Sequence, residues 1–96
     1  MVSINISFII PVYNRPEEID ELLNSFVNLE GFFDFEIVII EDGSNNCSDK
    51  IISKFSEKLN ISYYKKNNTG PGDSRNYGMK NAQGNKYLVR FSYHSS

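Results

Sequence analysis

Two apolar runs limit the fold of this chain more than any other feature. Residues 4–12 are almost wholly apolar, and residues 35–40 repeat the pattern. Both runs are rich in β-branched side chains, which is typical of strands covered on both faces. Such strands occur in parallel sheets with helices on either side, so the sequence predicts an α/β protein.

Helical periodicity follows these strands. Pro16 stands at a predicted first helical position, with two glutamates behind it where the helix dipole favours carboxylates. A single apolar stripe at helical spacing then runs up to Gly31, and it consists of Ile19, Leu22, Leu23, Phe26 and Leu29. A second helix is predicted over residues 48–59, and a third over residues 73–83, closed by Gly84.

Two shorter strands complete the predicted sheet, at residues 61–64 and 87–89. Strands that alternate with helices of about ten or more residues form βαβ units with right-handed crossovers. We therefore expect a Rossmann-like parallel sheet of about four strands with flanking helices. A chain of 96 residues holds no second domain, so residues 1–96 are expected to form a single one.

Composition excludes several classes of function. The net charge is −2 and the basic residues are scattered, so no basic stripe is available for nucleic acid. Cys47 is the only cysteine and His94 the only histidine, which excludes an internal disulfide and a clustered zinc site. No stretch approaches the roughly 18 apolar residues of a membrane span, and no basic segment precedes the first apolar run. The expected location is cytoplasmic.

Polar turns after the first two long strands form the first candidate site, because ligands of open α/β sheets bind where strands end at their carboxyl edge. One turn carries Pro11, Val12 and Tyr13, whose backbone groups can line a flat heterocycle. The other carries Asp42 and Ser44, and Asp42 can accept a hydrogen bond from a base or ribose. Taken alone, an Asp-Gly pair with a following serine is better explained as a simple turn, so the hypothesis draws its force from position.

The glycine-rich loop and helix start over residues 68–78 form the second candidate site. Its glycines admit close backbone approach, and Arg75 can pair with phosphate at the head of a helix. The alternative is a common Gly-Pro-Gly turn followed by a solvated arginine. Neither the phosphate-loop motif nor the dinucleotide-binding glycine spacing is present.

Three segments in order resemble the family 2 glycosyltransferases, whose nucleotide-sugar-binding fold is called GT-A. The segments are SFIIPVYN at 7–14, EIVIIEDGS at 36–44, and Asn68-x-Gly70 followed by SRNYG at 74–78. The resemblance implies a transferase that takes a nucleotide-diphosphate sugar, expected to be a UDP-sugar, and passes a hexosyl or related group to a glycan or other hydroxyl acceptor, as in polysaccharide biosynthesis.

The resemblance also implies roles for particular residues. The first loop, at Pro11, Val12 and Tyr13, would line the nucleoside. The acidic residue matched by Asp42 would contact the base, and the arginine matched by Arg75 would lie near base and phosphate. Together with Ser44, these are the residues expected to bind the nucleotide.

The family's metal-binding motif is missing from this sequence. In the family an Asp-x-Asp pair that binds Mn²⁺ or Mg²⁺ comes next, whereas here its two positions fall near Ser92 and His94, which cannot replace hard carboxylate ligands. Arg90, in what should be a central buried strand, is a second departure. We therefore expect a partial GT-A domain without metal ligands or catalytic residues. The full-length protein is expected to be cytoplasmic, and its association with a membrane stays open.

One other class of function stays open. A noncatalytic α/β binding or assembly module would pair its exposed sheet edge with another chain, for instance in a homo-oligomer. A nucleotidyltransferase of similar architecture is disfavoured, because the glycine- and lysine-rich loop that would follow its first strand is absent. Nucleotide binding separates the transferase hypothesis from the assembly hypothesis.

Overall fold

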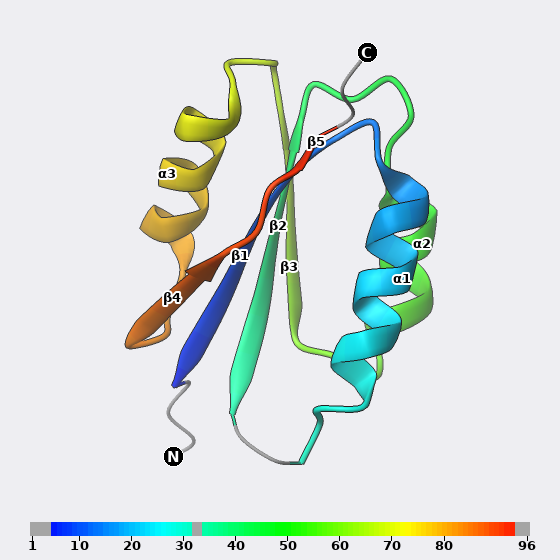
Figure 1. The fold of residues 1–96 in the computed structure, drawn as a ribbon, viewed down its shortest axis with the longest axis vertical. Coiled ribbons are helices and arrows are strands. Elements are labelled where there is room, and N and C mark those ends of the chain that lie inside the picture. The colour runs from blue at the N-terminus through cyan, green and yellow to red at the C-terminus, as the bar shows by residue number, and fades with distance from the viewer. Residues whose placement is uncertain (1–4, 32–33, 94–96) are drawn as a thin grey trace.

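A parallel sheet lies between layers of helices in the computed structural model, which describes residues 5–31 and 34–93 (Figure 1). The elements in chain order are β1 (Ile6–Tyr13), α1 (Pro16–Val27), β2 (Phe35–Asp42), α2 (Asp49–Phe55), β3 (Ile61–Lys66), α3 (Pro71–Asn81), β4 (Lys86–Val89) and β5 (Ser92–Tyr93). Strand order is β3-β2-β1-β4, with β5 paired to the end of β1, and the pairings are parallel. The predicted α/β class and parallel sheet are confirmed.

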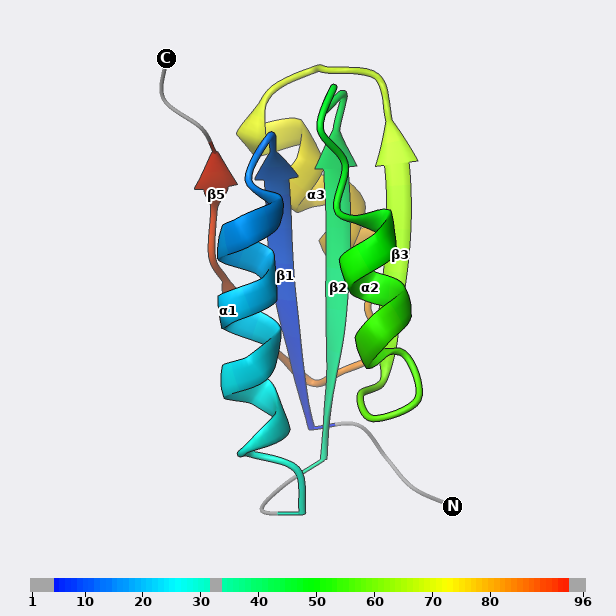
Figure 2. The same cartoon turned by 90° about the vertical axis from the view of Figure 1, so that its right-hand side faces the viewer.

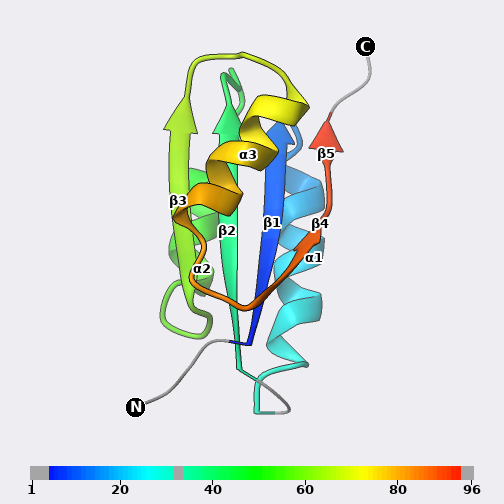
Figure 3. The same cartoon turned by 90° about the vertical axis from the view of Figure 1, so that its left-hand side faces the viewer.

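Helices cover the two faces of the sheet unequally. α1 and α2 lie side by side on one face (Figure 2), and within the described residues α3 alone lies on the other (Figure 3). The larger core lies under α1 and α2 and consists of Ile10, Val12, Ile19, Leu23, Phe26, Phe35, Ile37, Ile39, Ile52, Phe55 and Leu59. Under α3 the buried apolar side chains are those of Ile9, Val38 and Ile40. α3 packs closely there because Gly78 has no side chain: a Cβ would lie 2.6 Å from atoms of both Ile9 and Ile40.

The helices follow the predicted apolar stripes but differ at their ends. α1 begins at Pro16, as predicted, and the turn after it reaches Gly31, whose φ is +93°. α2 is shorter than predicted, because the residues after Phe55 form turns. α3 begins at Pro71 and not at Asp73, since the fixed φ of proline suits the first helical position. None of these differences moves a helix to the other face of the sheet.

A buried polar cluster fixes the turn between α3 and β4. Ser7 Oγ donates to Glu36 Oε2 at 2.5 Å, and the backbone N–H of Gln83 donates to the same oxygen at 2.5 Å. The N–H of Gly84 donates to Ser7 Oγ at 2.8 Å, and a Cβ at Gly84 would lie 2.5 Å from that oxygen. Gly84, predicted as a helix stop, therefore allows the close approach that places β4 beside β1.

The last two strands depart most from the prediction. Among the described residues β4 pairs with β1 alone, and all 4 of its residues are exposed. Arg90 follows β4 with its side chain 62% exposed, so the expectation of a central buried strand at this position is wrong. The physical reason is that no described helix or further strand covers β4. β5, which the sequence analysis missed, pairs with Val12 and Tyr13.

The predicted ends of the chain are tested in part. The first strand was expected to begin at residue 4, which lies outside the described residues, as does His94. Within residues 5–31 and 34–93, no helix combines the length and the apolar character needed to cross a bilayer.

Candidate functional site

The loops that follow β1 and β2 are joined to each other at the carboxyl edge of the sheet. Asn14 makes the connection: its backbone N–H donates to Ser44 Oγ at 2.9 Å. Its Oδ1 accepts the N–H groups of Asn45 at 2.8 Å and Asn46 at 3.1 Å. Asn14 has a φ of +54°, a left-handed conformation that asparagine tolerates better than most residues. The two predicted turns thus form one structural unit.

The three residues predicted at the end of β1 differ in what they can offer a ligand. The side chains of Pro11 and Val12 are fully buried, so contact with a ligand would come through their backbone groups. Tyr13 is half-buried, and its ring stacks on Tyr93 with centroids 5.9 Å apart and planes 29° from parallel. Tyr13 therefore offers a ligand its aromatic face, in addition to the backbone groups that were predicted.

The carboxylate of Asp42 lies at the centre of the site and is fully buried. Its Oδ1 accepts from Lys66 Nζ at 2.9 Å and from the backbone N–H of Thr69 at 2.9 Å. Its Oδ2 accepts from the N–H of Gly70 at 3.0 Å and from the Tyr93 hydroxyl at 2.6 Å. Burial alone would raise the pKa of Asp42, but the hydrogen bond from Tyr93 and those of the other donors lower it overall. Asp42 is therefore an ionised acceptor that already holds donors on both oxygens.

Glu41, the residue before Asp42, organises the loop between β2 and α2. Its buried carboxylate accepts from the backbone N–H of Ser48 at 2.8 Å and from the Tyr63 hydroxyl at 2.9 Å. Burial and the Glu41 carboxylate raise the pKa of Tyr63, which keeps that hydroxyl a donor. Ser44 also donates to Glu41 while it accepts from Asn14. Ser44 thus holds the loop together, and its contact with a ligand stays a prediction.

Arg75 is the predicted site residue that lies apart from the others. It is exposed on α3, and its guanidinium Nε and Nη2 lie 3.3 and 3.2 Å from Asn76 Oδ1. The preceding residue, Ser74, is fully buried, and its Oγ lies 3.4 Å from the Tyr93 hydroxyl. The structure brings Ser74 rather than Arg75 to the Asp42 network, and the phosphate role of Arg75 stays a prediction.

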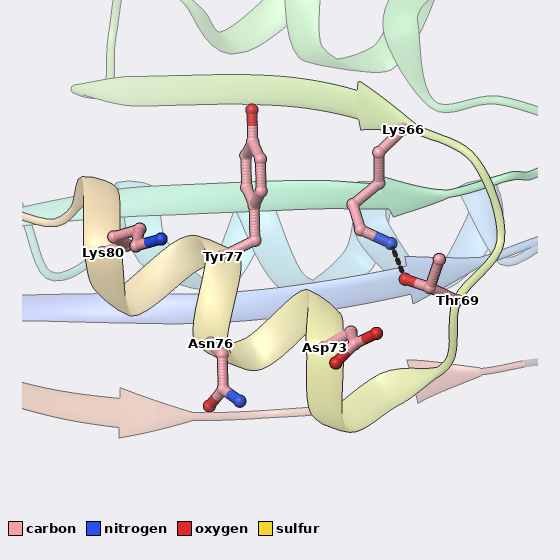
Figure 4. A pocket seen from close by; sticks show the side chains of 6 residues that line it. All are labelled: Lys66, Thr69, Asp73, Asn76, Tyr77 and Lys80. Atoms are coloured by element: carbon pink, nitrogen blue, oxygen red, sulfur yellow. Dashed lines mark hydrogen bonds between the residues drawn. The ribbon is translucent and has the colours of Figure 1, made fainter.

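Hollows of modest size lie beside this network in the described part of the chain. One of about 280 Å³ includes Gly43 and Ser44 in its wall. Another, of about 300 Å³, lies between the end of β3 and α3 (Figure 4), and it is lined by Lys66, Thr69, Asp73, Asn76, Tyr77 and Lys80. In the second hollow the ammonium of Lys66 bonds Thr69 and also reaches Asp42, so its charge is already compensated.

The described residues do not fit a divalent metal. No group of three or more His, Cys, Asp or Glu side chains in residues 5–31 and 34–93 could hold one. Ser92, at the position of the first expected aspartate, is buried in β5, and its side-chain hydroxyl has no hydrogen-bond partner among the described residues. A hard cation such as Mn²⁺ or Mg²⁺ requires several oxygen ligands, and a single serine hydroxyl does not supply them.

Several members of the network were missed by the sequence analysis. They are Asn14, Glu41, Lys66, Ser74 and Tyr93. Asn14 and Glu41 stand inside the motifs already quoted, next to predicted site residues, so position was an available signal for them. Lys66 ends a parallel strand at the same sheet edge, which was also a usable signal. Ser74 also stands inside a quoted motif, beside Arg75, whereas Tyr93 had no such signal.

Comparisons with known proteins give one consistent result. A family model described as Glycosyl transferase family 2 matches residues 7–93. The chain is similar to an uncharacterized glycosyltransferase of Rickettsia felis, with 42% identity over 84 residues that cover 88% of this chain and 14% of the relative. It is also similar to the poly(ribitol-phosphate) beta-N-acetylglucosaminyltransferase TarS of Staphylococcus aureus, with 38% identity over 81 residues, 81% of this chain and 14% of TarS. The chain thus spans a small part of these curated relatives.

A solved structure extends the similarity to three dimensions. The crystal structure of S. aureus TarS 1-349 in complex with UDP matches with a TM-score of 0.83 and 35% sequence identity. The match covers 93% of this chain and 27% of the TarS chain. Nearly the whole of the chain therefore has a counterpart of similar fold.

Proposed function

The chain belongs to glycosyl transferase family 2, and from this premise we propose that it forms the nucleotide-binding part of a longer glycosyltransferase. The proposed donor is a nucleotide-diphosphate sugar, with UDP as the nucleotide. The similarity to a TarS structure in complex with UDP supports this choice. The observation that carries the proposal is the joined pair of loops at one sheet edge, with the Tyr13 ring and the Asp42 carboxylate linked through Tyr93.

Each proposed contact uses a group with the required chemistry. The backbone around Pro11 and Val12 and the ring of Tyr13 would line the base. The carboxylate of Asp42, which is ionised and therefore only accepts hydrogen bonds, would receive an N–H of the base. Arg75 at the first turns of α3 would pair with the diphosphate, since a guanidinium binds phosphate through two parallel hydrogen bonds.

The proposed role of this chain is to bind and orient the donor. The family resemblance implies that a carboxylate base activates the acceptor hydroxyl and that Mn²⁺ or Mg²⁺ neutralises the departing diphosphate. The described residues supply neither a metal site nor a free carboxylate at the network, so we assign the chemical step to no residue among them.

The proposed acceptor is a glycan or another hydroxyl-bearing polymer, as in polysaccharide biosynthesis. Support comes from the relative TarS, whose name describes transfer of N-acetylglucosamine to poly(ribitol-phosphate). The proposed location is the cytoplasm, which is supported by a sequence with one cysteine, Cys47, and hence without an internal disulfide.

Titration of the ¹⁵N-labelled chain with UDP tests the proposal. We expect saturable shifts of the amide signals of Tyr13, Ser44 and Gly70, because these groups surround Asp42 and the joined loops. ADP and inorganic pyrophosphate are the matched controls: a cradle for the base responds more strongly to UDP than to ADP, and pyrophosphate alone leaves Tyr13 unshifted. Spectra of a folded chain that show no saturable response to UDP near Asp42 would reject the proposal.

The exposed edge of the sheet favours a second function, and we propose it as self-association of the chain. On and after β4, apolar side chains remain in contact with solvent: Tyr87 is 42% exposed, Leu88 52%, Val89 38% and Phe91 47%. An edge strand of this kind also offers unpaired backbone groups to a neighbouring strand. A second copy of the chain would cover both the exposed apolar side chains and the unpaired backbone groups.

The double variant Leu88→Asp and Phe91→Asp is expected to convert a self-associated chain to a monomer without unfolding it, because both side chains are exposed. Light scattering after size-exclusion chromatography measures the change. Leu29→Asp is the matched control, since Leu29 is exposed by 36% and stands just after α1, not on β4 or after it. A wild-type chain that is already monomeric at high concentration would remove this second function and leave the first untouched.

A further inference from the structure

The Tyr93 side chain connects the elements of the candidate site. Its hydroxyl donates to Asp42 Oδ2 at 2.6 Å and lies 3.4 Å from Ser74 Oγ. Its ring stacks on Tyr13, with centroids 5.9 Å apart. Its carbonyl oxygen accepts from Arg15 Nη1 at 3.4 Å. A flat ring with one hydrogen-bond donor is thus held against Tyr13 and directed at Asp42.

These contacts match those that the proposed function assigns to the base of a nucleotide. A pyrimidine such as uracil is also a flat ring, and its imide N–H is a donor suited to a carboxylate. Stacked aromatic rings gain from offset, near-parallel packing of the kind seen between Tyr13 and Tyr93. Tyr93 and the base would therefore use the same acceptor and the same ring face.

Among the described donors to Asp42, Tyr93 is the one whose departure disturbs the fold least. Thr69 and Gly70 donate backbone N–H groups from the loop that starts α3, and Gly70 holds a φ of +102°. Lys66 supplies the charge that compensates the buried carboxylate. Tyr93 donates from a side chain that is half-buried, on a strand of 2 residues.

We infer that Tyr93 competes with the nucleotide base for Asp42 and for the stacking face of Tyr13. The inference rests on the proposed function and adds a regulatory contact to the same site. Binding then proceeds by exchange: the phenol leaves Oδ2 of Asp42 and an N–H of the base takes its place. The apparent dissociation constant for UDP is the intrinsic constant divided by the fraction of molecules in which Tyr93 has withdrawn, so it rises as that fraction falls.

Three variants and one ring signal test the inference in the chain as it stands. Tyr93→Phe removes the hydroxyl and leaves Asp42 Oδ2 short of a donor that the base can supply, so UDP is expected to bind roughly tenfold more tightly. Tyr93→Ala also frees the face of Tyr13, and its affinity for UDP is expected to increase at least as much. Tyr87→Phe is the matched control, because Tyr87 is an exposed tyrosine on β4. In the wild-type chain with ¹³C-labelled tyrosines, UDP is expected to shift the ring signal of Tyr93 and not that of Tyr87.

The outcomes separate this inference from the function on which it rests. Tighter UDP binding by both Tyr93 variants, with Tyr87→Phe unchanged and a shifted Tyr93 ring signal, supports the competition. If the wild type binds UDP, the Tyr93 ring signal does not move, and Tyr93→Phe binds equally or more weakly, then the competition is overturned and the proposed function stands. If none of the four folded chains binds UDP, both are overturned.

Discussion

Asp42→Ala is expected to bring the chain close to unfolding and to abolish UDP binding. The substitution removes the acceptor of four hydrogen bonds among the described residues. It also leaves the ammonium of Lys66, whose side chain is 16% exposed, without its carboxylate. Removal of one partner from a buried ion pair costs about 3–5 kcal/mol, against a free energy of unfolding of about 5–15 kcal/mol for a whole domain. Urea denaturation followed by circular dichroism measures the loss.

An exposed ion pair provides the control for this substitution. Asp20 lies 3.5 Å from Lys54 with both side chains more than a third exposed, so Asp20→Ala should cost at most about 1 kcal/mol. If Asp42→Ala cost no more than Asp20→Ala, the Asp42 network would not hold the site together.

The pH dependence of stability gives an independent check on Asp42. Burial alone would raise the pKa of Asp42, but its hydrogen bonds, led by that of Tyr93, hold the pKa below the ordinary value. The folded state therefore binds this proton less readily than the unfolded state does. The resulting stability is present above about pH 4, the unfolded value, and is lost as the pH falls through the lower pKa of the folded state.

Gly43→Ala is expected to destabilise the chain by about 2–5 kcal/mol and to weaken UDP binding, through backbone conformation and a clash. Gly43 has a φ of +73°, and a Cβ there would lie 2.7 Å from the backbone nitrogen of Asn68. That backbone cannot rotate away as a side chain would. Displacement of the loop would draw the N–H groups of Thr69 and Gly70 away from Asp42. Thermal or urea denaturation measures the stability, and UDP titration measures the binding.

Gly31→Ala separates the two causes of this loss. Gly31 has a φ of +93°, yet a Cβ there would have no atom of the described residues within 4 Å. Its substitution should cost only the left-handed conformation, about 1–2 kcal/mol. Equal losses for Gly31→Ala and Gly43→Ala would show that the clash with Asn68 is absent and that the loop adapts.

The layered fold could be predicted because its signals are local. The buried run of β2 and the apolar stripe of α1 each lie within one short window of sequence, and their alternation implies parallel strands. The exposure of β4 could not be predicted in the same way. An apolar strand has the same sequence whether or not another element covers it, so the expected burial near Arg90 followed the family pattern and not the residues themselves.

The candidate site was predicted in outline but not in its contacts. Strand-end geometry correctly predicted that the loops of Tyr13 and Asp42 adjoin. Two of the donors to Asp42 were not predictable, because Thr69 and Gly70 use backbone groups, which carry no residue-type signal. Tyr93 lies 51 residues away along the chain, at a position where the family pattern suggested metal ligands.

The two helical layers have a consequence for how the site responds to a ligand. In the candidate site, Tyr13 and Asp42 stand on strands that are supported by the larger core under α1 and α2. Ser74 stands on α3, whose buried apolar support among the described residues is Ile9, Val38 and Ile40. Thinly packed segments open locally at lower free energy than the whole chain unfolds. A ligand that contacts both α3 and the ends of β1 and β2 would therefore couple these two parts of the chain, so that they unfold in a single transition.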